Sequence, residues 1–113
     1  GERKQFGKAI GEFQAIQFKL ADMATRITAG RTLLHTAAAA KHRGETVTRY
    51  CSMAKLFASE VAEKICSTAI QTLGGYGVVS DFPVERIYRD VRVCQIYEGT
   101  SDVQKIIIQR ALA

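Results

Sequence analysis

Residues 13–37, FQAIQFKLADMATRITAGRTLLHTA, have apolar or small side chains at alternating steps of three and four residues. A repeat of about 3.5 residues puts such side chains on one side of a helix, where they face a neighbouring helix. We therefore predict a long helix that begins at residue 11 or 12, ends at residue 42 or 43 and is followed by a left-handed cap at Gly44. The side chains predicted to face the neighbour are those of Phe13, Ile16, Leu20, Met23, Ile27, Gly30, Leu34 and Ala37.

A second long helix is predicted from Thr46 or Thr48, either of which can cap its start, to about Leu73. Small side chains recur every four residues from Ala54 to Cys66 and allow a neighbouring helix to approach closely. Two antiparallel helices joined by a short loop follow from this pattern. The larger apolar side chains that mark one face of the second helix are those of Tyr50, Met53, Phe57, Val61, Ile65 and Leu73.

Two shorter helices are predicted in the last third of the chain. Pro83 favours the first turn of a helix that reaches about Val93, and residues 94–100 form a loop. A last helix runs from Ser101 to about Leu112. The predicted fold class is therefore all-α: an up-and-down helical bundle of two long antiparallel helices and two shorter ones.

The start of the last helix matches a capping box. In this motif the Ser101 hydroxyl and the Gln104 side chain satisfy free backbone donors of the first turn, and Asp102 complements the positive end of the helix. The side chains predicted to be buried on this helix are those of Val103, Ile106 and Ile107.

Composition limits the classes of protein to which the chain can belong. The 113 residues suffice for one domain, and contents of 47% hydrophobic and 24% charged residues exclude the disordered and membrane classes. No apolar run approaches the ~20 residues that cross a bilayer, so no membrane insertion is predicted. Cys51, Cys66 and Cys94 lack the spacing of a zinc site, so we predict reduced thiols and no metal. Cys51 and Cys66 are expected to pack as small apolar side chains within the second helix.

The net charge of +5 is compatible with nucleic acid, an acidic membrane or a phosphorylated ligand. The basic residues are mostly scattered and lack the aromatic interleaving of a nucleic-acid surface, so no nucleic-acid partner is predicted. The exception is a row of Arg86, Arg89 and Arg92 on one helix face. Because Glu85 and Asp90 are interspersed, this row is either a salt-bridged or interface face or a phosphate site.

Residues 96–104, IYEGTSDVQ, place Glu98 between an aromatic residue and a glycine, immediately before a helix start. Gly99 allows the backbone to approach a ligand closely, and Tyr97 offers apolar surface. Together they can surround the Glu98 carboxylate with a partly dry pocket, which raises a carboxyl pKa and suits a base that removes a weakly acidic proton. The alternative is an ordinary loop with a solvated glutamate.

This nonapeptide resembles the catalytic segment of the acyl-CoA dehydrogenases, flavoenzymes that desaturate acyl-CoA thioesters between the α and β carbons. The resemblance extends over nearly the whole chain. Further matches, in chain order, are RKQFG at residues 3–7, FQAIQ at 13–17, LADM at 20–23, QTLGG at 71–75 and PVER at 83–86.

The resemblance implies that Glu98 is the catalytic base, taking the α-proton while the β-hydrogen leaves as hydride to flavin N5. It also implies that the backbone N–H of Glu98 and a flavin ribityl hydroxyl polarise the thioester carbonyl, as an oxyanion hole does, and that Gly99 lines the acyl-CoA site. The arrangement meets a physical demand, because a solvated carboxylate with a pKa of ~4.3 is too weak a base for a thioester α-proton.

The same resemblance implies a role in binding FAD. Arg3 matches the arginine that reaches the FAD pyrophosphate, and Phe6 accompanies it as an apolar contact. Thr100 and Asp102 match positions that contact the flavin, although Asp102 stands where the family usually has glutamate or glutamine.

A further set of residues resembles positions that contact the adenosine diphosphate part of the FAD bound to a partner subunit. The set consists of Gln14 and the segment from Gln71 to Gly75, in which Gly74 and Gly75 let main-chain N–H groups approach phosphate. Without the resemblance, these two glycines are a helix C-cap and a turn, and both interpretations can hold together.

We therefore expect residues 1–113 to be the C-terminal helical domain of a longer FAD-dependent acyl-CoA dehydrogenase of fatty acid metabolism, inactive alone, with residues 1–3 ending a preceding helix. The resemblance implies a homodimer or homotetramer, electron transfer to an electron-transferring flavoprotein, and a location in the bacterial cytoplasm or the mitochondrial matrix. The alternatives are an acyl-CoA oxidase and a non-catalytic helical module that binds nucleic acid or protein.

Overall fold

The computed structural model describes residues 2–113 of the chain, and it has the predicted all-α architecture. The four α-helices are α1 (Gln14–His42), α2 (Thr48–Leu73), α3 (Val84–Arg92) and α4 (Ser101–Arg110). The remaining elements are the two-residue strands β1 (Lys4–Gln5) and β2 (Lys8–Ala9) and the 3-10 turns η1 (Ile10–Glu12), η2 (Gly74–Gly77) and η3 (Val93–Gln95).

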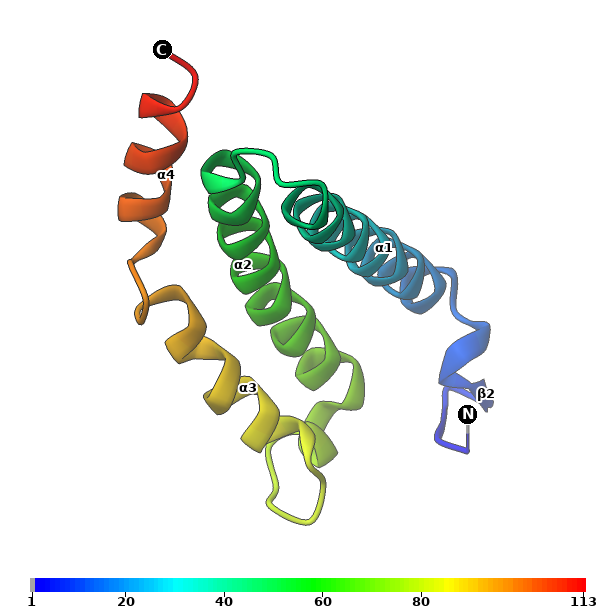
Figure 1. The fold of residues 1–113 in the computed structure, drawn as a ribbon. Coiled ribbons are helices and arrows are strands. Elements are labelled where there is room, and N and C mark those ends of the chain that lie inside the picture. The colour runs from blue at the N-terminus through cyan, green and yellow to red at the C-terminus, as the bar shows by residue number, and fades with distance from the viewer. Residues whose placement is uncertain (1) are drawn as a thin grey trace.

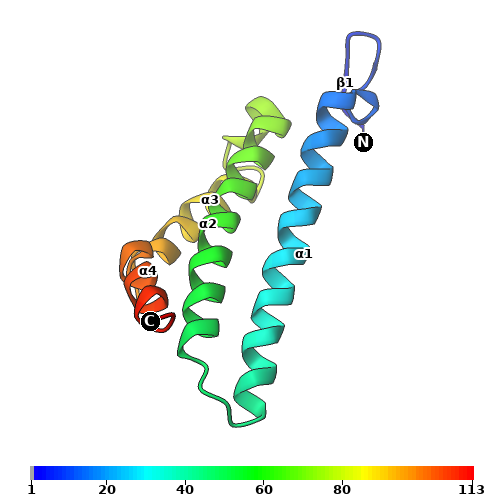
Figure 2. The ribbon, with the colours of Figure 1, turned by 90° about the horizontal axis from the view of Figure 1, so that it is seen from above.

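The two long helices α1 and α2 run antiparallel and lie side by side, as Figure 1 and Figure 2 show from two directions. Gly44 takes the predicted left-handed conformation (φ +75°) between them and lets the chain reverse after α1. The start of α1 was predicted two or three residues too early, because residues 10–12 form the separate turn η1 and Phe13 is extended. Neither Thr46 nor Thr48 caps α2: Val47 occupies the N-cap position, without a side-chain cap.

Helix α2 is the central element of the chain. Helix α1 packs against one side of it, while α3 and α4 pack against the other (Figure 1). The buried apolar residues come from the α1 and α2 helices and are small or medium in size: Ala37, Ala40, Ala54 and Val61. Among residues 2–113 no large side chain is fully buried.

The predicted apolar faces are only partly buried. On α1, Leu20 and Leu34 are 49% and 57% exposed, and Ile27 is also exposed, because α1 packs mainly against a single helix, α2, and buries a narrower stripe. On α4, Val103 and Ile106 were predicted to be buried but are exposed, whereas Ile107 is half-buried. The chain is elongated as a result: its radius of gyration is 17.4 Å, against about 13 Å for a compact chain of this length.

The N-terminal residues differ from the prediction of a helix tail. Gly1 lies outside the described residues, and residues 2 and 3 are not helical. The chain instead forms a tight hairpin in which Lys4 pairs with Ala9. Phe6 and Gly7 both have positive φ (+52° and +81°), which is typical of a two-residue turn that matches the twist of the flanking strands.

The cysteines form no disulfide within residues 2–113, in accordance with the prediction of free thiols. Cys66 and Cys94 are partly buried, but Cys51 is exposed and does not pack as predicted. In the described part of the chain, no helix has both the length and the apolar character needed to cross a bilayer, and no cluster of three potential metal ligands is found.

Candidate active site

The loop that bears Glu98 connects α3 with α4. After η3, the N–H groups of Ile96 and Tyr97 both donate to the Val93 carbonyl (2.9 and 3.1 Å), which closes a tight turn. The next two residues are left-handed: φ is +54° at Glu98 and +95° at Gly99. This conformation costs a non-glycine residue about 1–2 kcal/mol, so contacts elsewhere must hold Glu98 in it. The loop therefore projects the Glu98 side chain outward, where it is exposed.

The contacts that hold this turn come first from α4. Gln104 is only 6% exposed, and its side-chain amide nitrogen donates to the carbonyl oxygens of both Glu98 and Gly99 at 3.2 Å. A Cβ at Gly99 would lie 2.8 Å from the same nitrogen, so the Gln104 side chain would have to shift. Glycine at this position is thus favoured both by the positive φ and by the approach of Gln104.

The predicted capping box is wrong in its residues. Thr100 occupies the N-cap position, and its hydroxyl accepts a hydrogen bond from the Val103 N–H at 3.3 Å. Ser101 is the first helical residue, and its buried hydroxyl has no partner among residues 2–113. Gln104 does not make the predicted capping-box bond; its amide nitrogen donates to the carbonyls of the left-handed turn.

A second support for the loop comes from α2. The Lys55 ammonium donates to the Gly99 carbonyl oxygen at 2.6 Å, with the contact partly buried. Local sequence patterns do not indicate this contact, because it joins residues 44 positions apart. Lys55 would be found only by knowing that α4 and its preceding loop pack along α2.

A polar network also fixes η3 to α2. The half-buried Glu63 carboxylate accepts hydrogen bonds from the Tyr88 hydroxyl (3.3 Å) and from the Gln95 amide (3.4 Å). Gln95 also donates to the Ser59 carbonyl at 3.4 Å. The turn that precedes Glu98 is therefore tied to the middle of α2, through residues that no sequence motif indicates.

A cavity of about 270 Å³ lies between α2 and this loop. Tyr97 contributes its phenol, whose oxygen lies 3.1 Å from the Cys94 sulfur. The hydrogen bond with Cys94 raises the pKa of Tyr97 above its usual value. The residues that line the cavity are Lys55, Ala58, Ser59, Ala62, Cys94, Tyr97 and Glu98.

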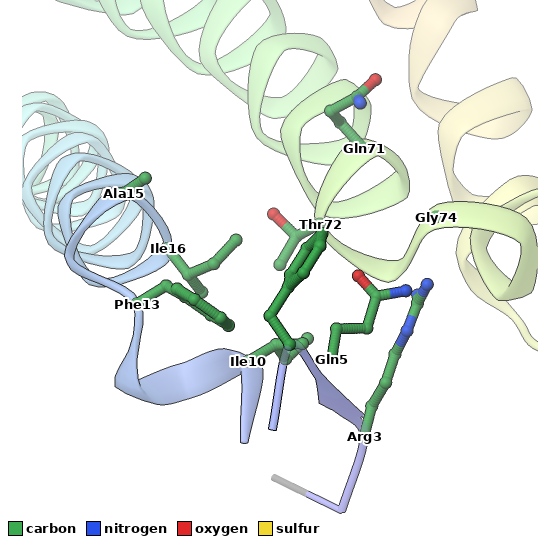
Figure 3. A pocket seen from close by; sticks show the side chains of 10 residues that line it. Arg3, Gln5, Ile10, Phe13, Ala15, Ile16, Gln71, Thr72 and Gly74 are labelled. Atoms are coloured by element: carbon green, nitrogen blue, oxygen red, sulfur yellow. The ribbon is translucent and has the colours of Figure 1, made fainter. Parts of the chain in front are cut away.

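A second cavity, of about 280 Å³, lies at the other end of the molecule, where the hairpin and the start of α1 meet the end of α2 (Figure 3). The Arg3 side chain runs along one side of it toward Gly74 and donates to the Leu73 carbonyl. The Arg3 guanidinium also lies 5.7 Å from the centre of the Tyr76 ring. The lining residues are Arg3, Gln5, Phe6, Ile10, Phe13, Ala15, Ile16, Gln71, Thr72 and Gly74.

Gly74 leaves room for the Arg3 side chain at this end of α2. Its φ is +62°, and a Cβ at this position would lie 2.9 Å from an Arg3 guanidinium nitrogen. A cation with several N–H donors thus stands beside exposed backbone and apolar surface, including Phe6, which is 92% exposed. This combination suits a phosphate-bearing ligand with an aromatic part.

Comparisons with known proteins identify the family. The family model described as acyl-CoA dehydrogenase, C-terminal domain, matches residues 1–113. The chain belongs to this family. The caffeyl-CoA reductase-Etf complex subunit CarC of Acetobacterium woodii is 50% identical over 111 residues, which are 98% of this chain and 29% of that protein.

Solved structures of acyl-CoA dehydrogenases and their relatives have the same fold. Butyryl-CoA dehydrogenase from Megasphaera elsdenii superimposes with a TM-score of 0.96 at 45% identity, covering 98% of this chain and 29% of that chain. The FAD complex of PigA superimposes with a TM-score of 0.94 at 36% identity, with the same coverage of both chains. The chain thus spans about three-tenths of the length of these relatives.

The structure divides the residues predicted from the acyl-CoA dehydrogenase resemblance into two groups. Glu98, Gly99, Thr100 and Asp102 lie together in the loop and the first turn of α4. In the second group, the cavity at the far end of α2 is lined by Arg3, Phe6, Gln71 and Gly74. Helix α2 lines the cavity at Glu98 from Lys55 to Ala62 and the cavity at Arg3 from Gln71 onward, so roughly 14–24 Å of helix at about 1.5 Å per residue lies between the two groups.

Three of the predicted positions lie less directly at these cavities. Gln14 is the first residue of α1; it is exposed and does not line the cavity at Arg3. Gly75 lies beside a neighbouring hollow, which it lines with Arg3 and Tyr76. Asp102 is exposed and pairs with Lys105 at 3.3 Å, on the surface of α4.

Proposed function

We propose that the chain is the C-terminal domain of an FAD-dependent acyl-CoA dehydrogenase in which Glu98 removes the α-proton of an acyl-CoA thioester. Membership of the family supports this assignment. The observation that carries it is the geometry of Glu98, whose left-handed backbone projects the carboxylate outward beside a cavity. The Glu98 backbone N–H makes no hydrogen bond within residues 2–113, so it is free to meet a substrate oxygen.

In the proposed reaction, Glu98 supplies both groups that an α-deprotonation needs. Its carboxylate takes the α-proton, while its N–H donates to the thioester carbonyl and stabilises the negative charge that develops on that oxygen. Gly99 keeps the surface next to these groups free of a side chain. Because Glu98 is exposed in this chain, we propose that surfaces from outside the chain exclude water and thereby strengthen the base.

The residues at the Arg3 cavity fit part of an FAD molecule. Arg3 would bind the pyrophosphate through its guanidinium, and the Gly74 backbone offers close approach without a side chain. Phe6 and Gln71 would contact the rest of the dinucleotide, and Gln14 and Gly75 would contact its outer part. Thr100 and Asp102 would lie on the flavin side, near Glu98. The chemistry that bound FAD supplies is acceptance of a hydride from the β carbon.

The distance between the two groups of residues favours an assembled enzyme. One chain places Glu98 beside residues 55–62 of α2 and Arg3 at the C-terminal end of that helix, so we propose that each FAD is shared between subunits of a homodimer or homotetramer. The proposed electron acceptor is an electron-transferring flavoprotein, in line with a relative named as a subunit of an Etf complex. We further propose that residues 1–113 alone have no dehydrogenase turnover and that the enzyme works in the bacterial cytoplasm or the mitochondrial matrix.

The test uses the full-length protein that contains this chain. It is loaded with FAD and mixed anaerobically with acyl-CoA thioesters of different chain lengths, and bleaching of the flavin absorbance gives the rate constant of reduction. Glu98→Gln should retain FAD but lose about 10²- to 10⁴-fold in this rate constant, because the base is removed. The control Glu60→Gln, which changes an exposed glutamate on α2, should behave like the parent.

Two outcomes would contradict the proposal. If no thioester bleaches the flavin of the parent protein, the chain serves a binding role instead. If Glu98→Gln is reduced as fast as the parent, Glu98 is not the base. Release of peroxide on readmission of air, at the rate of substrate turnover, would assign the enzyme to the oxidases instead of the dehydrogenases.

A further inference from the structure

The two carbonyl oxygens of the Glu98 turn receive donors from two different helices. Gln104 of α4 donates to the oxygens of Glu98 and Gly99, and Lys55 of α2 donates to the oxygen of Gly99. A carbonyl oxygen has two lone pairs, so the Gly99 oxygen can accept both hydrogen bonds at once. We call these two donors, Lys55 and Gln104, the carbonyl clamp.

The two donors of the carbonyl clamp constrain different features: the shape of the turn and its position relative to α2. Gln104 lies six residues from Glu98, on the helix that the turn itself begins, so it fixes the shape of the turn. Lys55 lies on α2, which forms the opposite wall of the cavity beside Glu98. Its hydrogen bond therefore sets where the turn stands relative to that wall. Apart from Lys55, no side chain of residues 2–113 outside the turn and α4 donates a hydrogen bond to the carbonyls of Glu98 or Gly99.

The geometry of the Lys55 contact is suited to holding a position. At 2.6 Å it is short for a hydrogen bond from nitrogen to oxygen, as charge-assisted bonds are, and it is partly buried. The ammonium has no carboxylate partner within ion-pair distance in the described residues, so the Gly99 carbonyl is its principal acceptor.

We propose that Lys55 is a positioning residue for Glu98: its ammonium holds the Gly99 carbonyl and thereby fixes the distance of the Glu98 carboxylate and N–H from the α2 wall of the cavity. This inference rests on the proposed function of Glu98. Lys55 itself touches neither the reacting carbon nor the proton. Its loss should therefore lower the rate of proton removal without removing the substrate or the cofactor from the enzyme.

The test measures rate and binding separately in the full-length, FAD-loaded protein. Anaerobic stopped-flow reduction over a range of acyl-CoA concentrations gives the limiting rate constant and the dissociation constant of the substrate. Lys55→Met keeps the length and apolar part of the side chain but has no donor. It should lower the limiting rate constant roughly 10- to 100-fold, since small misplacements of a catalytic group have effects of this size, and leave the dissociation constant within about 2-fold.

Two further variants distinguish positioning from a general structural role. Lys55→Arg restores a charged donor and should recover most of the limiting rate constant. Lys64→Met removes an exposed lysine from the same helix, where it makes no side-chain hydrogen bond or ion pair within residues 2–113, and should match the parent. If Lys55→Met does not load FAD, Lys55→Leu is measured in its place, because it also lacks a hydrogen-bond donor.

Each result decides the inference. A parent-like limiting rate constant in Lys55→Met or Lys55→Leu would overturn it, and so would an equal loss in Lys55→Met and Lys55→Arg. A loss that appears only in the dissociation constant would place Lys55 in substrate binding and also overturn it. If the parent itself is not bleached by any thioester, the proposed function fails first, which the same experiment shows before any variant is compared.

Discussion

The loop around Glu98 and the cavity around Arg3 are held in place in different ways. At the loop, the chain supplies its own supports: a buried amide from Gln104 and an ammonium from Lys55 converge on two neighbouring carbonyls. At the cavity, Arg3 bonds to the end of α2, but Phe6 is almost fully exposed and the hairpin that bears both residues contacts little else. One region is preorganised by the chain, and the other leaves its binding groups uncovered.

This difference matches the different roles proposed for the two regions. A proton-abstracting group must be within a fraction of an ångström of its place before the substrate arrives, because reorganisation during the reaction would add to the barrier. A cofactor site can instead be completed by the cofactor, whose binding free energy orders the arginine and the aromatic side chain. We therefore expect substitutions in the loop to affect both stability and rate, and those in the cavity to affect affinity.

The largest effect is expected at Gly99. Gly99→Ala forces a Cβ into a left-handed residue and against the Gln104 amide, so the free energy of unfolding should fall by about 2–3 kcal/mol, as measured by urea denaturation of the chain. Gly7→Ala is the matched control, because Gly7 also has positive φ but a Cβ there would have open space. It should cost only about 1 kcal/mol. Equal losses in the two variants would mean that the loop is no better ordered than the hairpin.

A smaller and purely local effect is expected at Arg3. Arg3→Met removes the guanidinium but keeps apolar bulk. The dissociation constant of FAD from the full-length protein should therefore rise about 10- to 100-fold, which is the loss expected when one or two charge-assisted hydrogen bonds are removed. Titration of the apoprotein with FAD, followed by fluorescence, measures this change. Lys4→Met removes the same charge from the adjacent strand and should leave the affinity nearly unchanged. An equally large loss of FAD affinity in Lys4→Met would mean that positive charge in general attracts the FAD phosphates, without a specific contact from Arg3.

The smallest effect concerns α2, the helix that joins the two regions. Burial, with a further contribution from Glu63, raises the pKa of the Cys66 thiol, so at pH 8 the thiolate fraction of Cys66 is low. In the chain, alkylation by iodoacetamide should be about 3- to 10-fold slower at Cys66 than at the exposed Cys51, as read by mass spectrometry. Urea should abolish the difference, and equal rates in the folded chain would mean that this part of α2 is open to solvent.

The same shift predicts a weak dependence of stability on pH. Since the folded state holds the Cys66 proton more tightly than the unfolded state, its contribution to the free energy of unfolding is complete below the ordinary thiol pKa of 9.0. The contribution is lost as the pH rises through the raised pKa of the folded state. Cys66→Ala should remove this decline above pH 9, which pH-dependent urea denaturation would detect.

Much of the fold was predictable because its signals are local. The periodic side chains of α1 and α2, the cap at Gly44 and the helix start after Pro83 each depend on residues within a turn or two of one another. The predicted burial of Leu20, Leu34 and Ile106 was wrong because periodicity shows that a face is apolar without showing whether this chain covers it.

The sequence predicted which residues form the candidate site, but not the contacts that hold them in place. The position of Glu98 between an aromatic residue and a glycine, before a helix start, indicates a functional loop. Its left-handed backbone and the hydrogen bond from Lys55 depend on contacts between segments far apart in the chain, which no local pattern encodes. The capping box failed for a related reason: the Gln104 side chain donates to the turn carbonyls in place of accepting from a backbone N–H, and only the three-dimensional turn brings those carbonyls to it.

The absence of any fully buried large side chain in residues 2–113 has a calorimetric consequence. The heat-capacity change of unfolding follows the apolar surface that unfolding exposes, and a typical domain of this length would show about 1.4–1.7 kcal/mol/K. This chain has less apolar surface left to expose, so its heat-capacity change should be well below that range, with a correspondingly small dependence of stability on urea concentration. Its stability curve against temperature should be unusually flat, with a broad thermal transition.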